Sequence, residues 1–369
     1  MSRIVSLDML RGYALVCIML NHMPHGVLRQ ATLTNFAIYD SAELFVLLSG
    51  FLVGLVWMKV ERSEGRLAAQ WRFARRAGQV WLALVLGGIM LALLSRGLLE
   101  LGFAHSAIWN EYARWIIDVP VGYVATLALM WMQPNLLDVL ALYVILLALA
   151  PVLVPLMLRW PVAFFAGSVA LWLVAVPLNA ALPNQRVEGG LLFNPFGWQL
   201  LFHSGVAMGA FRSRFMPVLR RHRRWITPVA VAISLYSLAM VTLWRLGPEG
   251  KRLADVLWHA VGVVDKWSLD WVRYVAIMAA SWLVAVPLSG LFAWAAGTGP
   301  GRALATIGRG GLVAFVACVL LSVLGDAMAL SLPPGAARLG VDLWTIGTLW
   351  LTAHLWLKLK ARHQARQRR

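Results

Sequence analysis

Apolar runs, each about long enough to cross a bilayer, recur from one end of the chain to the other. Hydrophobic residues make up 60% of the 369 residues and charged residues 13%, a balance that no soluble core of this size requires. The chain is therefore predicted to be an all-α, polytopic integral membrane bundle. We expect about ten spans, at 8–27, 41–58, 78–95, 136–157, 162–180, 198–211, 226–245, 271–294, 311–329 and 341–357.

The segment between the third and fourth spans is too long for a turn. Within it, residues 109–132 are amphipathic and are interrupted by Pro120 and Gly122. This pattern favours an interfacial or re-entrant pair of short helices over an eleventh span. Since no internal repeat is apparent, we predict one transmembrane domain over residues 1–357 and a basic cytoplasmic tail at 358–369.

The loops on the two sides of a ten-span bundle differ strongly in charge. One side holds 22 of the 33 lysines and arginines; it comprises the N-terminus, the tail and the loops at 59–77, 158–160, 212–225 and 295–310. The positive-inside rule makes this side cytoplasmic, with both termini inside. The net charge of +17 is thus mostly an orientation signal, although its clusters could also hold phosphates or anionic membrane lipid. Nucleic acid is not an expected partner, because no soluble module carries these residues.

Residues 7–51 contain the most unusual polar pattern, with ionisable side chains in or beside two apolar helices. Such groups are costly in hydrocarbon and need a reason. Arg11 and His22 lie eleven residues apart, which places them about 20° apart in azimuth and roughly 16 Å apart along one helical face. One face of the first helix therefore carries a guanidinium with an imidazole above it.

These ionisable residues also have purely structural interpretations. Asp8 could neutralise Arg11 on the next turn. Asp40 and Glu43 fit the N-cap and N3 positions of a capping box at the second helix, and the same carboxylates could instead orient His22 across the hairpin.

Other small and polar residues suggest structure more than chemistry. Gly50 and Gly54 form a small-xxx-small pattern that predicts close helix packing. Cys17 and Cys318 lie inside apolar segments, so neither a disulfide framework nor a thiolate metal site is indicated. The eight histidines are scattered without ligand-spaced partners, so we expect no metal and no permanently bound cofactor.

The arrangement of Arg11, ten intervening residues and His22 resembles the signature of the acyltransferase family 3 type of membrane acyltransferase. Several longer phrases are similar to the OpgC family, the succinyltransferases of osmoregulated periplasmic glucans, and they recur in order along most of the chain. They are LDMLRGYALVCIMLNHMP, TNFAIYDSAELFVLLSGF, LLDVLALYVILLALAP at 136–151, FNPFGWQLLFHSGVAMG at 193–209 and IGRGGLVAFVACVLLS at 307–322.

The resemblance implies an inner-membrane enzyme that moves an acyl group, most simply succinyl, from cytoplasmic acyl-CoA to a hydroxyl of a periplasmic glucan. A neutral imidazole suits removal of the hydroxyl proton, so His22 is the expected general base. Asn21 could donate to the thioester oxyanion, and Asp40 or Glu43 could orient the base. The candidate donor-binding residues are Arg11, which could instead hold the helix pair together, and the inner-side arginines Arg72, Arg75, Arg76 and Arg309.

Other functions and other residues remain open at this stage. The alternatives are O-acetylation of another envelope polysaccharide, transport, or a non-catalytic scaffold. Asp138 could be a helix cap or an acceptor-site residue. Candidates for stacking on sugar are the outer-side residues Trp109, Trp115, Trp131, Trp198, Trp258 and Trp267, and candidates for neutralising a succinyl carboxylate are Arg186, Lys251, Arg252 and Arg273. The oligomeric state does not follow from the sequence.

Overall fold

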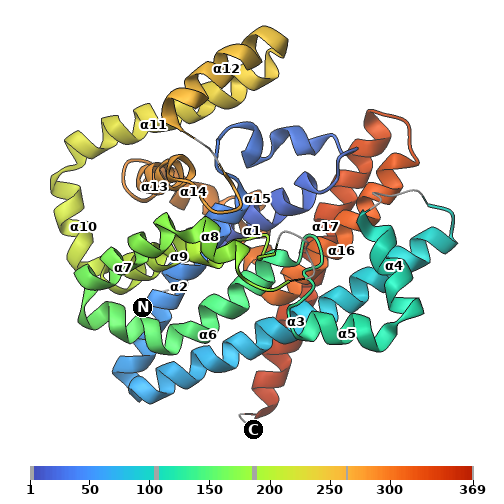
Figure 1. Ribbon diagram of the computed structural model, residues 1–369, viewed down its shortest axis with the longest axis horizontal. Coiled ribbons are helices and arrows are strands. Elements are labelled where there is room, and N and C mark those ends of the chain that lie inside the picture. Colours follow the sequence, from blue (N-terminus) through green and yellow to red (C-terminus); the bar gives the residue numbers. More distant parts are fainter. Residues whose placement is uncertain (1–3, 104–107, 185–188, 263–264, 368–369) are drawn as a thin grey trace.

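The computed structural model describes residues 4–103, 108–184, 189–262 and 265–367, and over these ranges it contains helices and no strand (Figure 1). The long helices form a bundle, while α11 and α12 form an arm that projects from it (Figure 1). The elements are α1 (Val5–Asn21), η1 (Leu28–Ala31), η2 (Leu33–Asn35), α2 (Ser41–Glu64), α3 (Arg66–Glu100), α4 (Ile108–Asp118), α5 (Pro120–Ala128), α6 (Asp138–Arg159), α7 (Pro161–Leu173), α8 (Ala175–Ala180), α9 (Pro195–Ala210), α10 (Arg212–Arg221), α11 (Arg223–Arg245), α12 (Gly247–Val261), α13 (Trp271–Ala285), α14 (Ser289–Gly297), α15 (Gly299–Gly310), α16 (Leu312–Leu330) and α17 (Ala336–Gln367).

Several of these helices are long and apolar enough to cross a membrane. Among the described residues, α2, α3, α6, α11 and α16 meet this criterion, and α13 with α14 would make a sixth span if the bent pair crosses as one. The chain is therefore a membrane protein with an all-α fold. The ten-span count and the cytoplasmic location of the termini stay predictions.

Prolines explain where predicted spans break. The predicted span 162–180 divides into α7 and α8 at Val174, because Pro177 lacks an N–H and its ring conflicts with the carbonyl of Leu173. The predicted span 271–294 bends by 71° between α13 and α14, next to Pro287. The first helix ends at Asn21 rather than at residue 27.

Two further predicted boundaries can be compared with the helices. In the predicted segment 109–132, the structure contains the two short helices α4 and α5, which end at Ala128, and this confirms the predicted pair of short helices. The last helix, α17, runs without a break through residue 358 into the basic tail. The division of the chain into a domain and a tail stays a prediction.

Close packing of α2 on α9 depends on glycine. A Cβ atom at Gly50 would overlap the carbonyl oxygen of Phe202, and one at Gly54 would overlap that of Val206. On the facing helix α9, a Cβ atom at Gly205 would overlap the carbonyl oxygen of Leu47 in α2. The two backbones therefore touch over several turns, and the close packing predicted from the Gly50–Gly54 pattern is confirmed.

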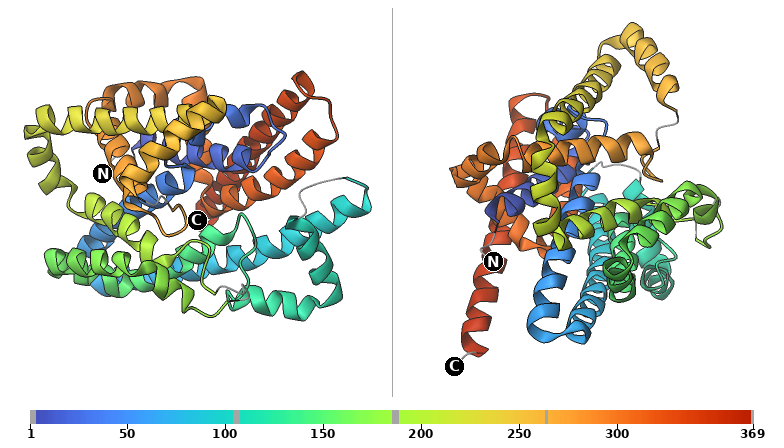
Figure 2. Two further views of the ribbon diagram at one scale, coloured as in Figure 1. Left: turned by 45° about the horizontal axis from the view of Figure 1, so that its top comes forward. Right: turned by 90° about the vertical axis from the view of Figure 1, so that its left-hand side faces the viewer.

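The ends of the bundle agree with the predicted sidedness of the loops. The right-hand view of Figure 2 shows the turn between α2 and α3 and the end of α17 projecting from the same end of the molecule. Both belong to the arginine-rich set of loops. The α2–α3 turn and the end of α17, which the charge distribution assigns to one side of the membrane, therefore lie at one end of the molecule.

Glycine packing gives a direct test of the fold. We expect Gly50→Ala to lower the free energy of unfolding by about 1–3 kcal/mol, because the added methyl group must push α2 from α9. Gly78→Ala is the matched control, since a Cβ atom there meets nothing within 4 Å and alanine favours a helix. Thermal unfolding of both variants in detergent measures the difference. Equal midpoints would contradict the packing described above.

Candidate active site

A cavity of about 270 Å³ lies where the end of α1, the start of α2 and the start of α6 meet the segment before α13. Its volume is close to that of small-ligand sites in other proteins. Polar and aromatic side chains mix in its wall, a combination that suits a sugar. The polar lining residues are Asn21, His22, Arg29, Thr34, Asp40, Ser41, Asp138 and Lys266, and the aromatic ones are Phe45, Phe193, Trp267 and Phe315.

His22 faces this cavity from the end of α1. The helix ends at Asn21, and the His22 side chain is exposed. Its Nδ1 lies 2.6 Å from the carbonyl oxygen of Ile18. A carbonyl oxygen can only accept, so Nδ1 donates, and in the neutral ring Nε2 carries the free lone pair. The imidazole thus has the tautomer that a general base needs.

Asn21 lines the same cavity, with its amide group aligned by the loop that follows α1. Its Oδ1 accepts from the hydroxyls of Thr32 at 2.5 Å and Thr34 at 3.1 Å. The amide oxygen is therefore occupied, and the NH₂ group is the part that can donate to a ligand. Although Asn21 and His22 point about 100° apart on an ideal helix, the structure brings both to one cavity.

Asp40 and Glu43 form the predicted capping box of α2. The Ala42 N–H donates to Asp40 Oδ1 at 2.7 Å, and the Asp40 N–H donates to Glu43 Oε2 at 3.0 Å. The structural interpretation of these carboxylates is thus confirmed. The hydrogen bond that orients His22 is the one that its Nδ1 donates to the Ile18 carbonyl.

The same carboxylates also belong to a buried ionic network. Lys266 Nζ lies 2.6 Å from Asp40 Oδ2, and Arg273 pairs with the fully buried Glu43. Arg273 also donates to the Ile38 carbonyl at 2.7 Å. Burial opposes ionisation of Asp40, but Lys266 and Arg273 outweigh it and hold the pKa of that carboxyl below its usual range. This network fixes the start of α2 to the segment around α13.

Lys266 is a site residue that sequence reasoning missed. It lies in a segment between two predicted spans that carries no motif, and its partner Asp40 is more than two hundred residues away. The one sequence feature that could have suggested a site residue is its place between Asp265 and Trp267, where two opposite charges lie beside an indole. Pairing over such a distance depends on the packing of α13 against α2, which no local pattern specifies.

The loop after α1 is held over the site by two carboxylates of the last helices. Asp342 of α17 is fully buried, and its Oδ2 accepts from the N–H groups of Val27 and Leu28, both at 2.7 Å. Asp326 of α16 lies 3.1 Å from His25 Nδ1. His25 is thus engaged with α16 and does not line the cavity.

One of the predicted sugar-stacking tryptophans reaches the cavity. Trp267 lines it and is 43% exposed. Trp198 is fully buried and donates to the Trp267 carbonyl at 3.0 Å, so its assignment as a sugar platform is wrong. Trp115, Trp131 and Trp258 lie outside the lining, and the side chain of Trp109 is outside the described residues.

Of the residues predicted to neutralise a succinyl carboxylate, Arg273 needs correction. Arg273 is buried and neutralised by Glu43, so it is not free to bind an anion. Lys251 and Arg252 lie exposed on α12, where Arg252 pairs with Glu249, and Arg186 is outside the described residues. Within the cavity, the cations are Arg29 and Lys266.

The candidate donor-binding arginines lie apart from the cavity. Arg72, Arg75 and Arg309 are exposed, and Arg76 donates to Gln79 at 3.0 Å. Arg11 lies in the middle of α1, within electrostatic range of Arg76. Their role in binding a donor stays a prediction, as does the absence of a metal; within the described ranges, no three potential metal ligands gather.

Comparison with known protein families decides the family of this chain. The family model described as OpgC protein matches residues 3–361. The chain belongs to the OpgC family. Membership implies acyltransferase activity in general. Comparison with curated proteins and with solved structures gives no significant match.

The ionic network of this OpgC family member can be tested by removing one partner. Arg273→Met leaves Glu43 buried without its cation, which costs about 3–5 kcal/mol in comparable cases. We therefore expect a large fall in the thermal unfolding midpoint, partly restored in the double variant Glu43→Gln/Arg273→Met. Arg252→Met breaks an exposed pair with Glu249 and should change stability little. A similar loss in both single variants would argue against the network.

Proposed function

We propose that this protein transfers a succinyl group from cytoplasmic succinyl-CoA to a hydroxyl of periplasmic glucan in the bacterial inner membrane. Membership of the OpgC family supports acyl transfer, and the charge of the loops supports an inner-membrane protein with cytoplasmic termini. The cavity at His22 lies at the end of α1 opposite to the cytoplasmic N-terminus in this topology. The acceptor would therefore enter from the periplasm.

The observation that carries this proposal is the bond between His22 and Ile18. It leaves Nε2 as the proton acceptor, in a cavity that also contains the Asn21 amide. In the proposed reaction, Nε2 takes the proton of the sugar hydroxyl while the hydroxyl oxygen attacks the thioester carbonyl. Asn21 donates to the oxyanion that forms. The carbon–sulfur bond then breaks, and the CoA thiolate leaves and takes up a proton.

Other lining residues suit the two substrates. Trp267 provides an indole face for a sugar ring, and Asp138 provides a carboxylate that can accept from a sugar hydroxyl. Arg29 lines the cavity and, among the described residues, makes no ion pair, whereas Lys266 is neutralised by Asp40. We therefore assign Arg29 to the distal carboxylate of the succinyl group.

The donor would approach from the opposite side. Arg11 lies roughly 16 Å from His22 along α1, toward the N-terminus. It would therefore lie beside a donor that extends from the cytoplasmic end of the bundle to His22. The phosphates of CoA would then meet the inner-side arginines Arg72, Arg75, Arg76 and Arg309. Membrane lipid and the glucan are the remaining expected partners.

The base assignment predicts the effect of removing the imidazole. Proton transfer by a positioned base contributes about 10²- to 10⁴-fold, so His22→Ala should lower turnover by about that factor. Mass spectrometry of glucan incubated with succinyl-CoA and purified protein measures the transferred groups, and acetyl-CoA in a parallel reaction tests acetyl transfer. Cys17→Ala is the control, because Cys17 is buried lower on α1 and the proposed reaction needs no thiol.

Stability must be measured beside activity, since loss of the Ile18 bond could also loosen the end of α1. A His22→Ala protein with an unchanged unfolding midpoint and near-normal turnover would remove His22 from the mechanism. If vesicles that contain the protein take up succinyl-CoA but no glucan is modified, transport would be favoured instead.

The proposed sidedness has its own test. A reporter that is active in the periplasm alone, fused after Arg369, should give no signal if the C-terminus is cytoplasmic. The same reporter inserted in the loop between α11 and α12 should be active, because that loop lies on the acidic, outer side in the ten-span arrangement. A strong signal from the C-terminal fusion would mean that the number of crossings is odd.

A further inference from the structure

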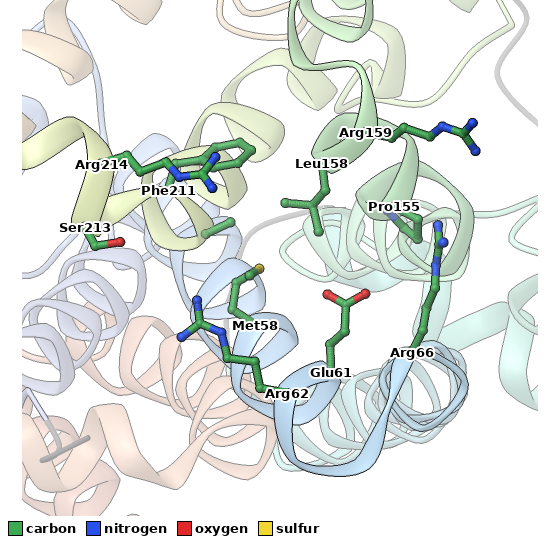
Figure 3. Close-up of a pocket in the computed structure, with 11 residues that line it drawn as sticks. Met58, Glu61, Arg62, Arg66, Pro155, Leu158, Arg159, Phe211, Ser213 and Arg214 are labelled. Carbon is green, nitrogen blue, oxygen red and sulfur yellow. The ribbon is translucent and has the colours of Figure 1, made fainter.

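A second cavity, of about 410 Å³, lies at the other end of α2. It is bounded by the ends of α2 and α6, the start of α3, and the junction of α9 with α10 (Figure 3). Along α2, its Glu61 is roughly 28 Å from Ala42 at the His22 cavity, close to the thickness of the hydrocarbon core. The two cavities are therefore at opposite ends of the bundle.

Charged side chains from four helices surround this second cavity. Arg62, Arg66 and Arg214 line it, and none of the three makes an ion pair among the residues that the structure describes. Arg159 also lines it, with its guanidinium carbon 4.4 Å from the Trp160 ring centroid. The cavity thus has an excess of positive charge suited to a phosphate group.

A single carboxylate lies among these arginines. Figure 3 shows Glu61 pointing into the cavity, with Arg62 and Arg214 on one side and Arg66 on the other. Glu61 Oε2 accepts from the Trp57 indole at 3.1 Å, which fixes the side chain and leaves its other oxygen directed to the cavity. A ligand that fills this space must therefore offer an anion to the arginines and a hydrogen-bond donor to Glu61.

The surroundings of the cavity are those of a membrane surface. It lies where two candidate spans, α2 and α6, end. Exposed apolar side chains lie on the elements that bound the cavity, and they include Leu156 of α6, Trp160 at its end and Phe215 of α10. Exposed indoles beside arginines are typical of the interface between hydrocarbon and headgroups. A ligand here could place acyl chains on these side chains and its polar group in the cavity.

We propose that this cavity binds the headgroup of a phospholipid that carries a protonated amine. The phosphodiester meets Arg62, Arg66 and Arg214, and the ammonium donates to Glu61. A choline headgroup has no N–H to donate. The hydroxyls of a glycerol headgroup can donate to Glu61, but they lack the charge that strengthens a hydrogen bond to a carboxylate, so both lipids bind less tightly. The phosphates of CoA share the anionic chemistry but lack the amine at this position. The site is independent of acyl transfer at His22.

The test compares the binding of short-chain lipids to the purified full chain in detergent, by microscale thermophoresis. The probes are dihexanoyl phosphatidylethanolamine, the corresponding choline and glycerol lipids, and CoA. We expect the ethanolamine lipid to bind about tenfold more tightly than the choline lipid, since a charged hydrogen bond to Glu61 is gained. Glu61→Gln should abolish this preference while leaving the choline lipid bound.

A matched pair of variants tests the arginines. Arg62→Gln/Arg214→Gln should weaken binding of the ethanolamine lipid about 10- to 100-fold. Arg220→Gln/Arg221→Gln removes the same charge from exposed positions of α10 outside the cavity and should change binding less than about twofold. Equal weakening in both pairs would show general attraction to the basic surface and overturn the site. Tighter binding of CoA than of the ethanolamine lipid would make the cavity a donor site instead, and an ethanolamine preference that survives Glu61→Gln would overturn the role of the carboxylate.

Discussion

The pairing of Arg273 with Glu43 is the interaction on which the end of the bundle around the His22 cavity depends. Glu43 is fully buried, and an isolated charge in such a place would cost several kcal/mol. Arg273 neutralises it and also donates to the Ile38 carbonyl just before α2. Asp270 caps α13 three residues earlier and accepts from the Arg273 N–H, so the backbone that carries the guanidinium is held in place. The charges of Glu43 and Arg273, each costly in hydrocarbon alone, therefore stabilise the contact between α2 and α13.

The His22 cavity follows from this arrangement. The network fixes the start of α2, and Lys266 extends it through Asp40 to the cavity wall. On the opposite side, Asp342 and Asp326 hold the loop that follows α1. His22 lies between these two supports and needs a single local bond, from its Nδ1 to Ile18, to present Nε2. The imidazole of His22 is thus positioned by elements from both halves of the sequence.

The sequence predicted what local rules determine. The apolar runs indicated the helical membrane fold, the Asp40–Glu43 spacing indicated the capping box, and Gly50–Gly54 indicated a close crossing. The partners were not predictable, because Lys266 and Arg273 meet Asp40 and Glu43 through packing of segments more than two hundred residues apart. The same limit explains the errors at Arg273 and Trp198, which look like exposed outer residues in the sequence but are buried by neighbouring helices.

The helix that carries the capping box also explains why the two ends of the molecule differ in chemistry. Between Asp40 and Glu61, α2 lies against α9 with backbones in contact at Gly50 and Gly54, so no side chain and no ligand can pass between these two helices. A second pair is closed in the same way, since a Cβ atom at Gly12 of α1 would overlap the carbonyl oxygen of Leu304 in α15, and one at Gly308 would overlap that of Asp8. Arg11, in the middle of α1, lies within electrostatic range of Arg76 in α3. Backbone contacts at glycine thus join α2 to α9 and α1 to α15, and the charged groups at the two ends of α2 are kept a helix length apart.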